Sequence, residues 1–176
     1  MVNQPNRVKE SKIDMNLEWT IGCRPSELSP HEKMQVIDLF EKQTGEQYTI
    51  HSLNSLNIPE WYGNLLLRDS ITKTIKGVFW SHPVGHESVR IAAFVLSNET
   101  QNQGIGTSIW SHCVNLFLEQ GYQTLRLEVR SDNERALSFY QHRGLIISET
   151  LTGYYAAGPG YLMTGRLPSM LNASTE

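Results

Sequence analysis

A short polar loop with two glycines, Gln101–Thr107, joins a predicted buried strand to a predicted amphipathic helix. The segment before the loop, Val89–Leu96, is rich in β-branched and apolar residues, which is typical of a buried strand. After the loop, apolar residues at every fourth position predict a helix that ends at about residue 120: Ile105, Ile109, Cys113 and Phe117. The first turn of a helix has unpaired N–H groups and a partial positive charge, which suit a phosphate. Gly104 and Gly106 have no side chain to block those donors, so the loop predicts a phosphate site.

The spacing within the loop separates three kinds of phosphate-binding motif. A dinucleotide-binding fingerprint needs a third glycine, but Ile109 stands at that position. A Walker loop needs a lysine after its last glycine, and the loop contains none. The remaining pattern, Gln101-x-x-Gly104-x-Gly106, resembles the acetyl-CoA loop of the GNAT acetyltransferases.

Size and composition limit the classes of function. The chain has 176 residues and a mass of 20.0 kDa, which predicts one domain with a full core. A net charge of -3 gives no electrostatic reason to expect nucleic acid or a membrane as a partner. Neither the two cysteines nor the loop histidines His82 and His86 have the spacing of a metal site, so no metal is expected. The N-terminus has no apolar leader segment, and we expect a cytoplasmic protein.

Hydrophobic periodicity predicts a mixed α/β (α+β) domain. The predicted order is strand, helix, three strands in an antiparallel meander, helix, strand, helix and two strands. The strands are expected at 19–24, 64–68, 75–80, 89–96, 123–130, 146–150 and 161–165, and the helices at 31–44, 105–120 and 133–143. Residues 46–63 are predicted to form a short helix or an ordered loop. Flexible tails are expected at 1–16 and 168–176, which leaves a domain over 17–167.

A second motif strengthens the resemblance. The pattern from Leu127 to Leu145 reads Leu-Glu-Val-Arg-x-x-Asn-x-x-Ala-x-x-Phe-Tyr-x-x-x-Gly-Leu. It resembles the GNAT segment that follows the acetyl-CoA helix, and above all the ribosomal-protein N-terminal alanine acetyltransferases. The Tyr154–Met163 segment is similar to the Tyr-Tyr loop and last strand of that branch. The resemblance is close from Val89 to Met163 and implies a GNAT-like domain: a mixed, mostly antiparallel sheet with a central splayed strand pair and flanking helices.

The resemblance also implies a role for each motif, with acetyl-CoA (coenzyme A) as cofactor. The strand end would bind the pantetheine arm through Phe94, Val95 and Leu96. The loop would hold the pyrophosphate through Gln101, Asn102, Gln103, Gly104, Ile105, Gly106 and Thr107. Asn133 would contact the pantetheine side and Tyr140 the sulfur, while Glu128 would face the incoming amine.

The chemistry of acetyl transfer needs these residue types. A protonated amine must lose a proton before it attacks a thioester, and Glu128 is a suitable base, directly or through one water. The leaving thiolate needs a proton, which Tyr140 can donate. Three alternatives stay open: an ion pair of Glu128 with Arg126 or Arg130, packing of Tyr140 beside Phe139, and a capping role for Asn133 at the start of its helix.

Four aromatic residues are expected to flank the acceptor amine: Trp61, Tyr62, Tyr154 and Tyr155. The alternative for Trp61 and Tyr62 is a hydrophobic cluster under a loop, and for Tyr154 and Tyr155 it is strand-end packing over the core. Aromatic walls with few acids suit a peptide backbone better than a polycation. The chain departs from the N-terminal acetyltransferase branch at Gly158-Pro159-Gly160, where acidic residues are common there, and at Asn102, where a basic residue is usual.

The leading hypothesis is therefore an N-acetyltransferase, a monomer or homodimer, acting on a peptide N-terminus or another amine-bearing substrate. A small-amine acetyltransferase, for a polyamine, an amino acid or an aminocyclitol, is the second hypothesis. A non-catalytic acyl-CoA-binding module is the third.

Overall fold

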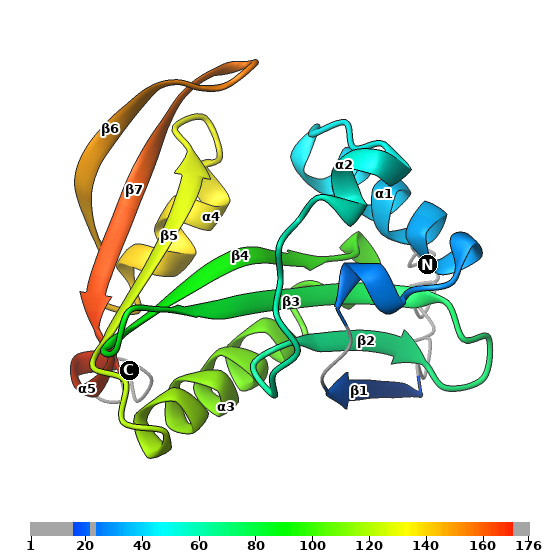
Figure 1. Cartoon of the computed structure of the whole chain (residues 1–176), viewed down its shortest axis with the longest axis horizontal. Helices are drawn as coiled ribbons and strands as arrows, with labels where there is room; N and C mark the ends of the chain where they lie inside the picture. The colour runs from blue at the N-terminus through cyan, green and yellow to red at the C-terminus, as the bar shows by residue number, and fades with distance from the viewer. Residues whose placement is uncertain (1–15, 22–23, 171–176) are drawn as a thin grey trace, which may run out of the picture.

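The computed structural model describes residues 16–21 and 24–170, and its centre is a seven-stranded mixed sheet with the order β1-β2-β3-β4-β5-β7-β6 (Figure 1). The strands are β1 (Leu17–Ile21), β2 (Leu65–Asp69), β3 (Ile75–Val84), β4 (Ser88–Leu96), β5 (Thr124–Arg130), β6 (Ile146–Tyr155) and β7 (Gly158–Arg166). The helices are α1 (Pro30–Thr44), α2 (Ile50–Asn54), α3 (Ile105–Glu119), α4 (Glu134–Gln141) and α5 (Leu167–Met170), with short 3₁₀ turns η1 (Pro25–Glu27) and η2 (Asn98–Thr100). The predicted single α/β domain is confirmed.

The two central strands, β4 and β5, separate after a short common stretch. They pair in parallel from Ser88–Thr124 to Ile91–Leu127, while β4 remains paired with β3 as far as Leu96. Beyond this point β5 stays paired with β7 and turns away from β4 (Figure 1). All other neighbouring strands of the described sheet are antiparallel. The predicted splayed pair in a mostly antiparallel sheet is therefore confirmed.

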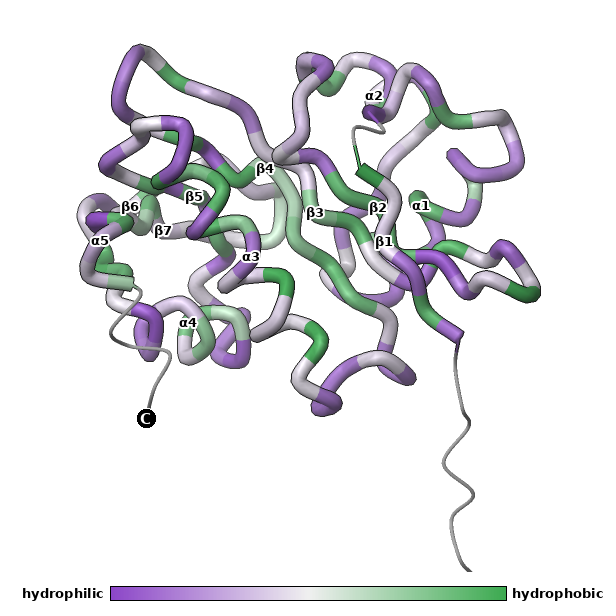
Figure 2. Tube along the Cα trace, turned by 90° about the horizontal axis from the view of Figure 1, so that it is seen from below, coloured by the Kyte–Doolittle hydropathy of each residue, from purple (hydrophilic) through white to green (hydrophobic). Residues whose placement is uncertain are grey.

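Helices cover both faces of the sheet, because neighbouring residues of a strand point to opposite faces. On β3, Phe79 packs in a core formed with α3, α4 and β5, whereas Val78 and Trp80 pack in a second core with α1 and α2. All three side chains are fully buried. Figure 2 shows hydrophobic residues concentrated along the central strands. The first core contacts both split strands, and the second contacts β4 from the opposite face.

Capping residues set the ends of the helices near the split. Ser29 caps α1 with a reciprocal contact to Glu32, and Gly45 ends this helix with a left-handed φ of 73°, as the sequence predicts. Helix α4 is capped by Asn133, whose side chain accepts a hydrogen bond from the Ala136 N–H at 3.1 Å. The capping role left open for Asn133 is therefore the one formed, and the helix begins one residue later than the predicted start at residue 133.

The structure corrects other boundaries. Strands β6 and β7 form one long hairpin, so Tyr154 and Tyr155 lie in a strand rather than in the predicted loop. Residues 168–170, assigned from sequence to a flexible tail, belong to α5, and Met170 is buried. The short helix α2 agrees with the expectation for residues 46–63. The remaining tail predictions, at 1–15 and 171–176, and residues 22–23 of the predicted first strand lie outside the described residues.

No helix among the described residues is both long enough and apolar enough to span a membrane.

We predict that Phe117→Ala lowers the free energy of unfolding by about 3–5 kcal/mol, because a fully buried aromatic side chain leaves a cavity. Phe117 stacks on Trp61 with ring centroids 5.4 Å apart. Urea denaturation followed by circular dichroism measures the change. The control is Ile146→Ala, which removes a side chain that is 67% exposed and should change stability by less than about 0.5 kcal/mol. Equal effects of the two variants would contradict this account of the core.

Candidate active site

The separation of β4 and β5 opens into a cleft of about 570 Å³. The cleft lies between the end of β4, the glycine loop, α4 and the last turn of α1. Ten residues predicted to bind the cofactor line it: Phe94, Val95, Leu96, Gln101, Asn102, Gly104, Gly106, Thr107, Asn133 and Tyr140, the last of which is also a predicted catalytic residue. The sequence missed the α1 wall, formed by Lys42, Gln43 and Thr44, and Arg135 of α4. Gln103 and Ile105 do not line the cleft.

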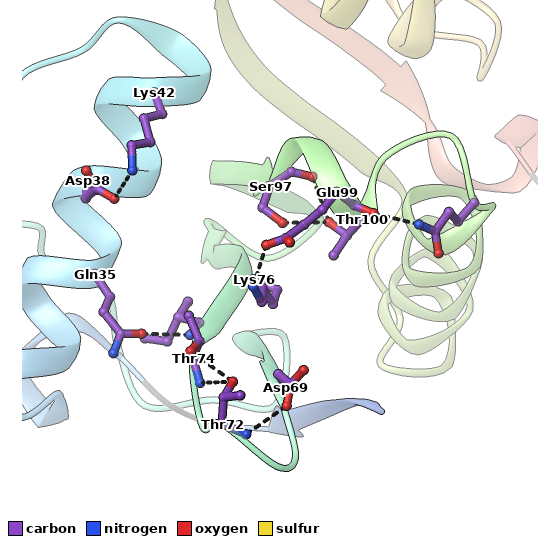
Figure 3. Close-up of polar contacts among 12 residues, drawn as sticks. Gln35, Asp38, Lys42, Asp69, Thr72, Thr74, Lys76, Ser97, Glu99 and Thr100 are labelled. Carbon is purple, nitrogen blue, oxygen red and sulfur yellow. Dashed lines mark hydrogen bonds and ion pairs between the residues drawn. The ribbon is translucent and has the colours of Figure 1, made fainter. Parts of the chain in front are cut away.

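A polar scaffold holds the segment just before the glycine loop. Lys76 of β3 forms an ion pair with Glu99, and the buried Thr100 donates a hydrogen bond to the Ser97 carbonyl at 2.9 Å (Figure 3). Gln103 Nε2 donates to the Glu99 carbonyl at 2.6 Å. The Gln103 side chain thus stabilises the loop through this hydrogen bond and does not line the cleft.

The two glycines of the loop serve different purposes. Gly104 caps α3 in the left-handed region with φ of 77°, where a side chain would strain the backbone. A Cβ at Gly104 would meet no atom within 4 Å, whereas one at Gly106 would lie 3.4 Å from Leu96 Cδ1. Gly104 therefore allows the turn, whereas a side chain at position 106 would contact Leu96 and narrow the cleft.

Gln101 ties the loop to both sides of the cleft. Its Nε2 donates to the Leu96 carbonyl at 2.6 Å and to Gln43 Oε1 of α1 at 2.9 Å. Its Oε1 accepts a hydrogen bond from Arg135 of α4. This side chain therefore links α1, the end of β4 and α4 at the mouth of the cleft.

Tyr140 and Asn133 both belong to the α4 wall. Burial raises the pKa of Tyr140 above its ordinary value, so the phenol keeps its proton throughout the neutral range. Tyr140 also packs against Trp110 and Phe139, with centroids 5.7 and 5.5 Å away, so packing and exposure to the cleft occur together. Asn133 likewise caps α4 and lines the cleft.

Glu128 lies where β4 and β5 separate, bound to Arg90 of β4. Arg90 Nε donates to both carboxylate oxygens at 3.0 and 2.9 Å, and its Nη2 lies 2.8 Å from Oε2. The ion pair expected with Arg126 or Arg130 is therefore not the one formed. Burial alone would lower the pKa of Arg90, but the hydrogen bonds and charge of Glu128 outweigh burial and raise it. Glu128 does not line the cleft. An amine that approaches the Glu128 carboxylate would have to share it with Arg90.

Arg90 also touches two further side chains. Its Nη2 donates to the Tyr154 hydroxyl at 3.3 Å, and its Nη1 lies 3.4 Å from His82 Nε2. Burial, with the charges of Arg90 and Arg126, lowers the pKa of His82, which leaves a neutral imidazole beside the ion pair. The described residues contain no cluster of three His, Cys, Asp or Glu side chains that could hold a metal.

Four residues form a polar aromatic wall on this side of the split: Glu46, Tyr48, Tyr154 and Tyr155. Burial raises the pKa of Glu46, opposed by a hydrogen bond to Tyr48 and the charge of Arg130. Burial and the nearby Glu46 raise the pKa of Tyr48 to about 12, and burial likewise raises that of Tyr155. The sequence predicted the two β6 tyrosines here but missed Glu46 and Tyr48. The sequence feature that could have identified Glu46 and Tyr48 is their position directly after Gly45, the residue that ends α1.

Trp61 and Tyr62, the other predicted acceptor residues, lie elsewhere. Trp61 stacks on Phe117, and its Nε1 donates to the Ser81 carbonyl at 2.6 Å. Tyr62 donates to Gln120 Oε1 at 2.6 Å, at the C-terminal end of α3. The α3 N-terminus forms the cleft, so this pair lies at the opposite end of that helix. Packing on the core explains Trp61, whereas Tyr62 is 41% exposed and is held by its hydrogen bond to Gln120.

Residues 33–145, more than half of the chain, match the model of the acetyltransferase (GNAT) family. Among curated proteins, N-alpha-acetyltransferase 30 of Schizosaccharomyces pombe is 34% identical over 68 residues, which are 39% of this chain and 45% of that protein. The chain therefore matches less than half the length of this relative.

Two solved structures share the fold. Ard1 from Thermoplasma volcanium superposes with a TM-score of 0.72 at 23% identity, over 86% of this chain and 97% of that one. The ribosomal-protein-S18-alanine N-acetyltransferase from Escherichia coli gives a TM-score of 0.68 at 18% identity, over 86% and 94%.

We predict that Gly106→Val weakens acetyl-CoA binding at least tenfold, about 1.4 kcal/mol, because its methyl groups narrow the cleft beside Leu96. Isothermal titration calorimetry measures the change. The control is Asn115→Val, which adds the same side chain to an exposed position of α3 outside the cleft. Unchanged affinity in a folded Gly106→Val protein would show that acetyl-CoA does not bind in this cleft.

Proposed function

The chain belongs to the acetyltransferase (GNAT) family, and we propose that it transfers an acetyl group from acetyl-CoA to the N-terminal amine of a peptide. The observation that carries the proposal is the cleft between the separated strands, with the glycine loop at its mouth and a buried tyrosine in its wall. Similarity to N-alpha-acetyltransferase 30 supports a peptide acceptor.

The cleft residues fit the chemical character of acetyl-CoA. The β4 segment from Ala93 to Leu96 is paired with β3 on one edge, and its other edge is unpaired with β5, so backbone groups are available to the amide-rich pantetheine arm. Backbone N–H groups at the start of α3 suit a pyrophosphate. When bound, acetyl-CoA supplies an acetyl group activated as a thioester.

The proposed acid and base come from opposite walls of the split. Tyr140 holds a proton on the cofactor side and would donate it to the leaving sulfur; its raised pKa keeps it protonated but makes transfer less favourable unless the thiolate lies close. Glu128 would accept the proton of the amine, directly or through one water. Arg90 positions the carboxylate by binding both of its oxygens.

The charges beside Glu128 favour an acceptor with a single cation. Arg90 stands next to the proposed base, and Arg126 extends from the same face of β5, where Arg130 is paired with Asp132. Against them, Glu46 is one carboxyl among three tyrosines and could pair with one ammonium. A polyamine would bring a second positive charge toward these arginines, which is unfavourable at short range.

We predict that Tyr140→Phe slows acetyl transfer about 10²–10⁴-fold where chemistry limits the rate, because the phenol proton is lost. Acetyl-CoA affinity should change less than about threefold, since the ring remains. Single-turnover kinetics measure the chemical step, and calorimetry measures binding. Tyr122→Phe is the matched control, because this tyrosine packs edge-on against Trp61, at the end of α3 away from the cleft. An unchanged chemical step would assign Tyr140 to packing alone.

We predict that kcat/KM for a short peptide with a free N-terminus exceeds that for spermidine, spermine or lysine by at least tenfold, about 1.4 kcal/mol of transition-state stabilisation. Release of the free thiol from acetyl-CoA is the measurement. The same peptide with a blocked N-terminus and a free lysine side chain is the control. A polyamine used as well as the peptide would contradict the proposed acceptor and leave the acetyl transfer itself intact. If none of the amines in the panel gives thiol release, both the proposed acceptor and the proposed acetyl transfer are contradicted.

A further inference from the structure

The glycine loop, Gln101–Thr107, contains no charged residue. A pyrophosphate in contact with this loop would find backbone N–H donors but no cation on the loop itself. Charge-assisted hydrogen bonds to phosphate are about twice as strong as neutral ones, so a nearby cation matters for affinity. Two cationic side chains line the cleft: Lys42 of α1 and Arg135 of α4. Arg143 does not line it, although its Nη2 donates to the hydroxyl of Thr107 at the end of the loop at 2.7 Å.

Arg135 is already placed at the mouth of the loop. Its Nη1 donates to Gln101 Oε1 and its Nη2 donates to Asn102 Oδ1, the latter at 2.9 Å. Asn102 has a left-handed φ of 59°, so the turn of the loop directs this residue toward α4. Within the described residues Arg135 has no ion pair, whereas Lys42 is held by Asp38 at 2.7 Å. Arg135 is therefore the cation in the cleft that is bound to neutral amide oxygens alone.

A guanidinium fork matches a phosphate better than it matches two amide oxygens, because both of its N–H groups can meet anionic oxygens in one plane. The contacts with Gln101 and Asn102 hold the long side chain near its binding position, which lowers the entropy lost when a ligand binds. Exchange of neutral partners for an anion needs only a small shift of an exposed side chain.

We propose that Arg135 is a phosphate-binding residue that supplies, from α4, the cation that the glycine loop lacks, and that its ligand is the pyrophosphate of acetyl-CoA. This inference rests on the proposed function. It assigns the first turn of α4 a role in affinity for the cosubstrate, beside the role of Asn133 and Tyr140 in the same wall.

The test compares Arg135→Gln with the wild type by calorimetry, using acetyl-CoA and acetyl-dephospho-CoA, which lacks the 3′-phosphate but keeps the pyrophosphate. Arg135→Gln should lower the affinity for both ligands equally, by about 10–100-fold. Arg135→Lys should recover part of the loss, because it keeps the charge without the fork. Arg166→Gln is the matched control: it removes an exposed arginine at the end of β7 and should leave both affinities unchanged.

Each other outcome overturns the inference. A loss seen with acetyl-CoA but not with acetyl-dephospho-CoA would assign Arg135 to the 3′-phosphate. Unchanged affinity for both ligands would show that Arg135 only braces the loop, while the proposed function would stand. Failure of the wild type to bind either ligand would remove the proposed function together with this inference.

Discussion

The parallel pairing of β4 and β5 ends at Ile91 and Leu127, and the arrangement of the site depends on this break. Each strand keeps a partner beyond it, β3 for β4 and β7 for β5, so neither strand leaves its backbone unsupported where the two diverge. Alternation along β5 then directs Leu127 and Val129 into the core and Glu128 to the opposite face. A continuous parallel pair would leave no room for a ligand between the strands. The open edge is stable because one core joins β2, β3 and β4 to β5 and β7 on one face of the sheet, while a second core packs β2, β3 and β4 against α1 and α2 on the other face.

Charge is arranged differently on the two sides of this opening. On the acceptor side the ion pair of Arg90 and Glu128 is largely enclosed, with side chains 25% and 15% exposed. Removing one partner of such a pair leaves a poorly solvated charge, so Arg90 and Glu128 have to be understood together. On the cofactor side Arg135 is exposed and bound to amides, which a ligand can replace at small cost. A fixed pair suits the positioning of a reacting group, and an exchangeable contact suits binding of an anion.

Local sequence patterns were sufficient for the elements and for most of the cofactor side. The glycine loop, the helix after it and the block from Leu127 to Leu145 are each continuous in sequence, so their motifs could carry a resemblance, and that resemblance implied one cofactor site for their residues. The partner of Glu128 could not be predicted, because Arg90 comes from another strand and its position depends on the register of the β4–β5 pair. The position of Trp61 could not be predicted for a similar reason, because the sequence does not say which face of the sheet its loop crosses. Glu46 and Tyr48 come near Tyr154 and Tyr155 only in the folded chain, because the two pairs are more than 100 residues apart in sequence.

The last turn of α1 belongs to both sides of the opening. Gln43 and Thr44 line the cofactor cleft, whereas Glu46, just beyond the left-handed turn at Gly45, faces the tyrosines of the acceptor side. The unpaired carbonyls at a helix end favour a cation. Arg130, at the end of β5, donates to the Thr44 carbonyl at 2.9 Å, and a Cβ on Gly45 would lie 3.4 Å from the same guanidinium. This hydrogen bond joins β5 to helix α1, which packs on β3 and β4, and so connects the two sides of the split. The width of the opening is therefore set by the contact of Arg130 with the end of α1 as well as by the sheet, and the two proposed binding sites share one wall.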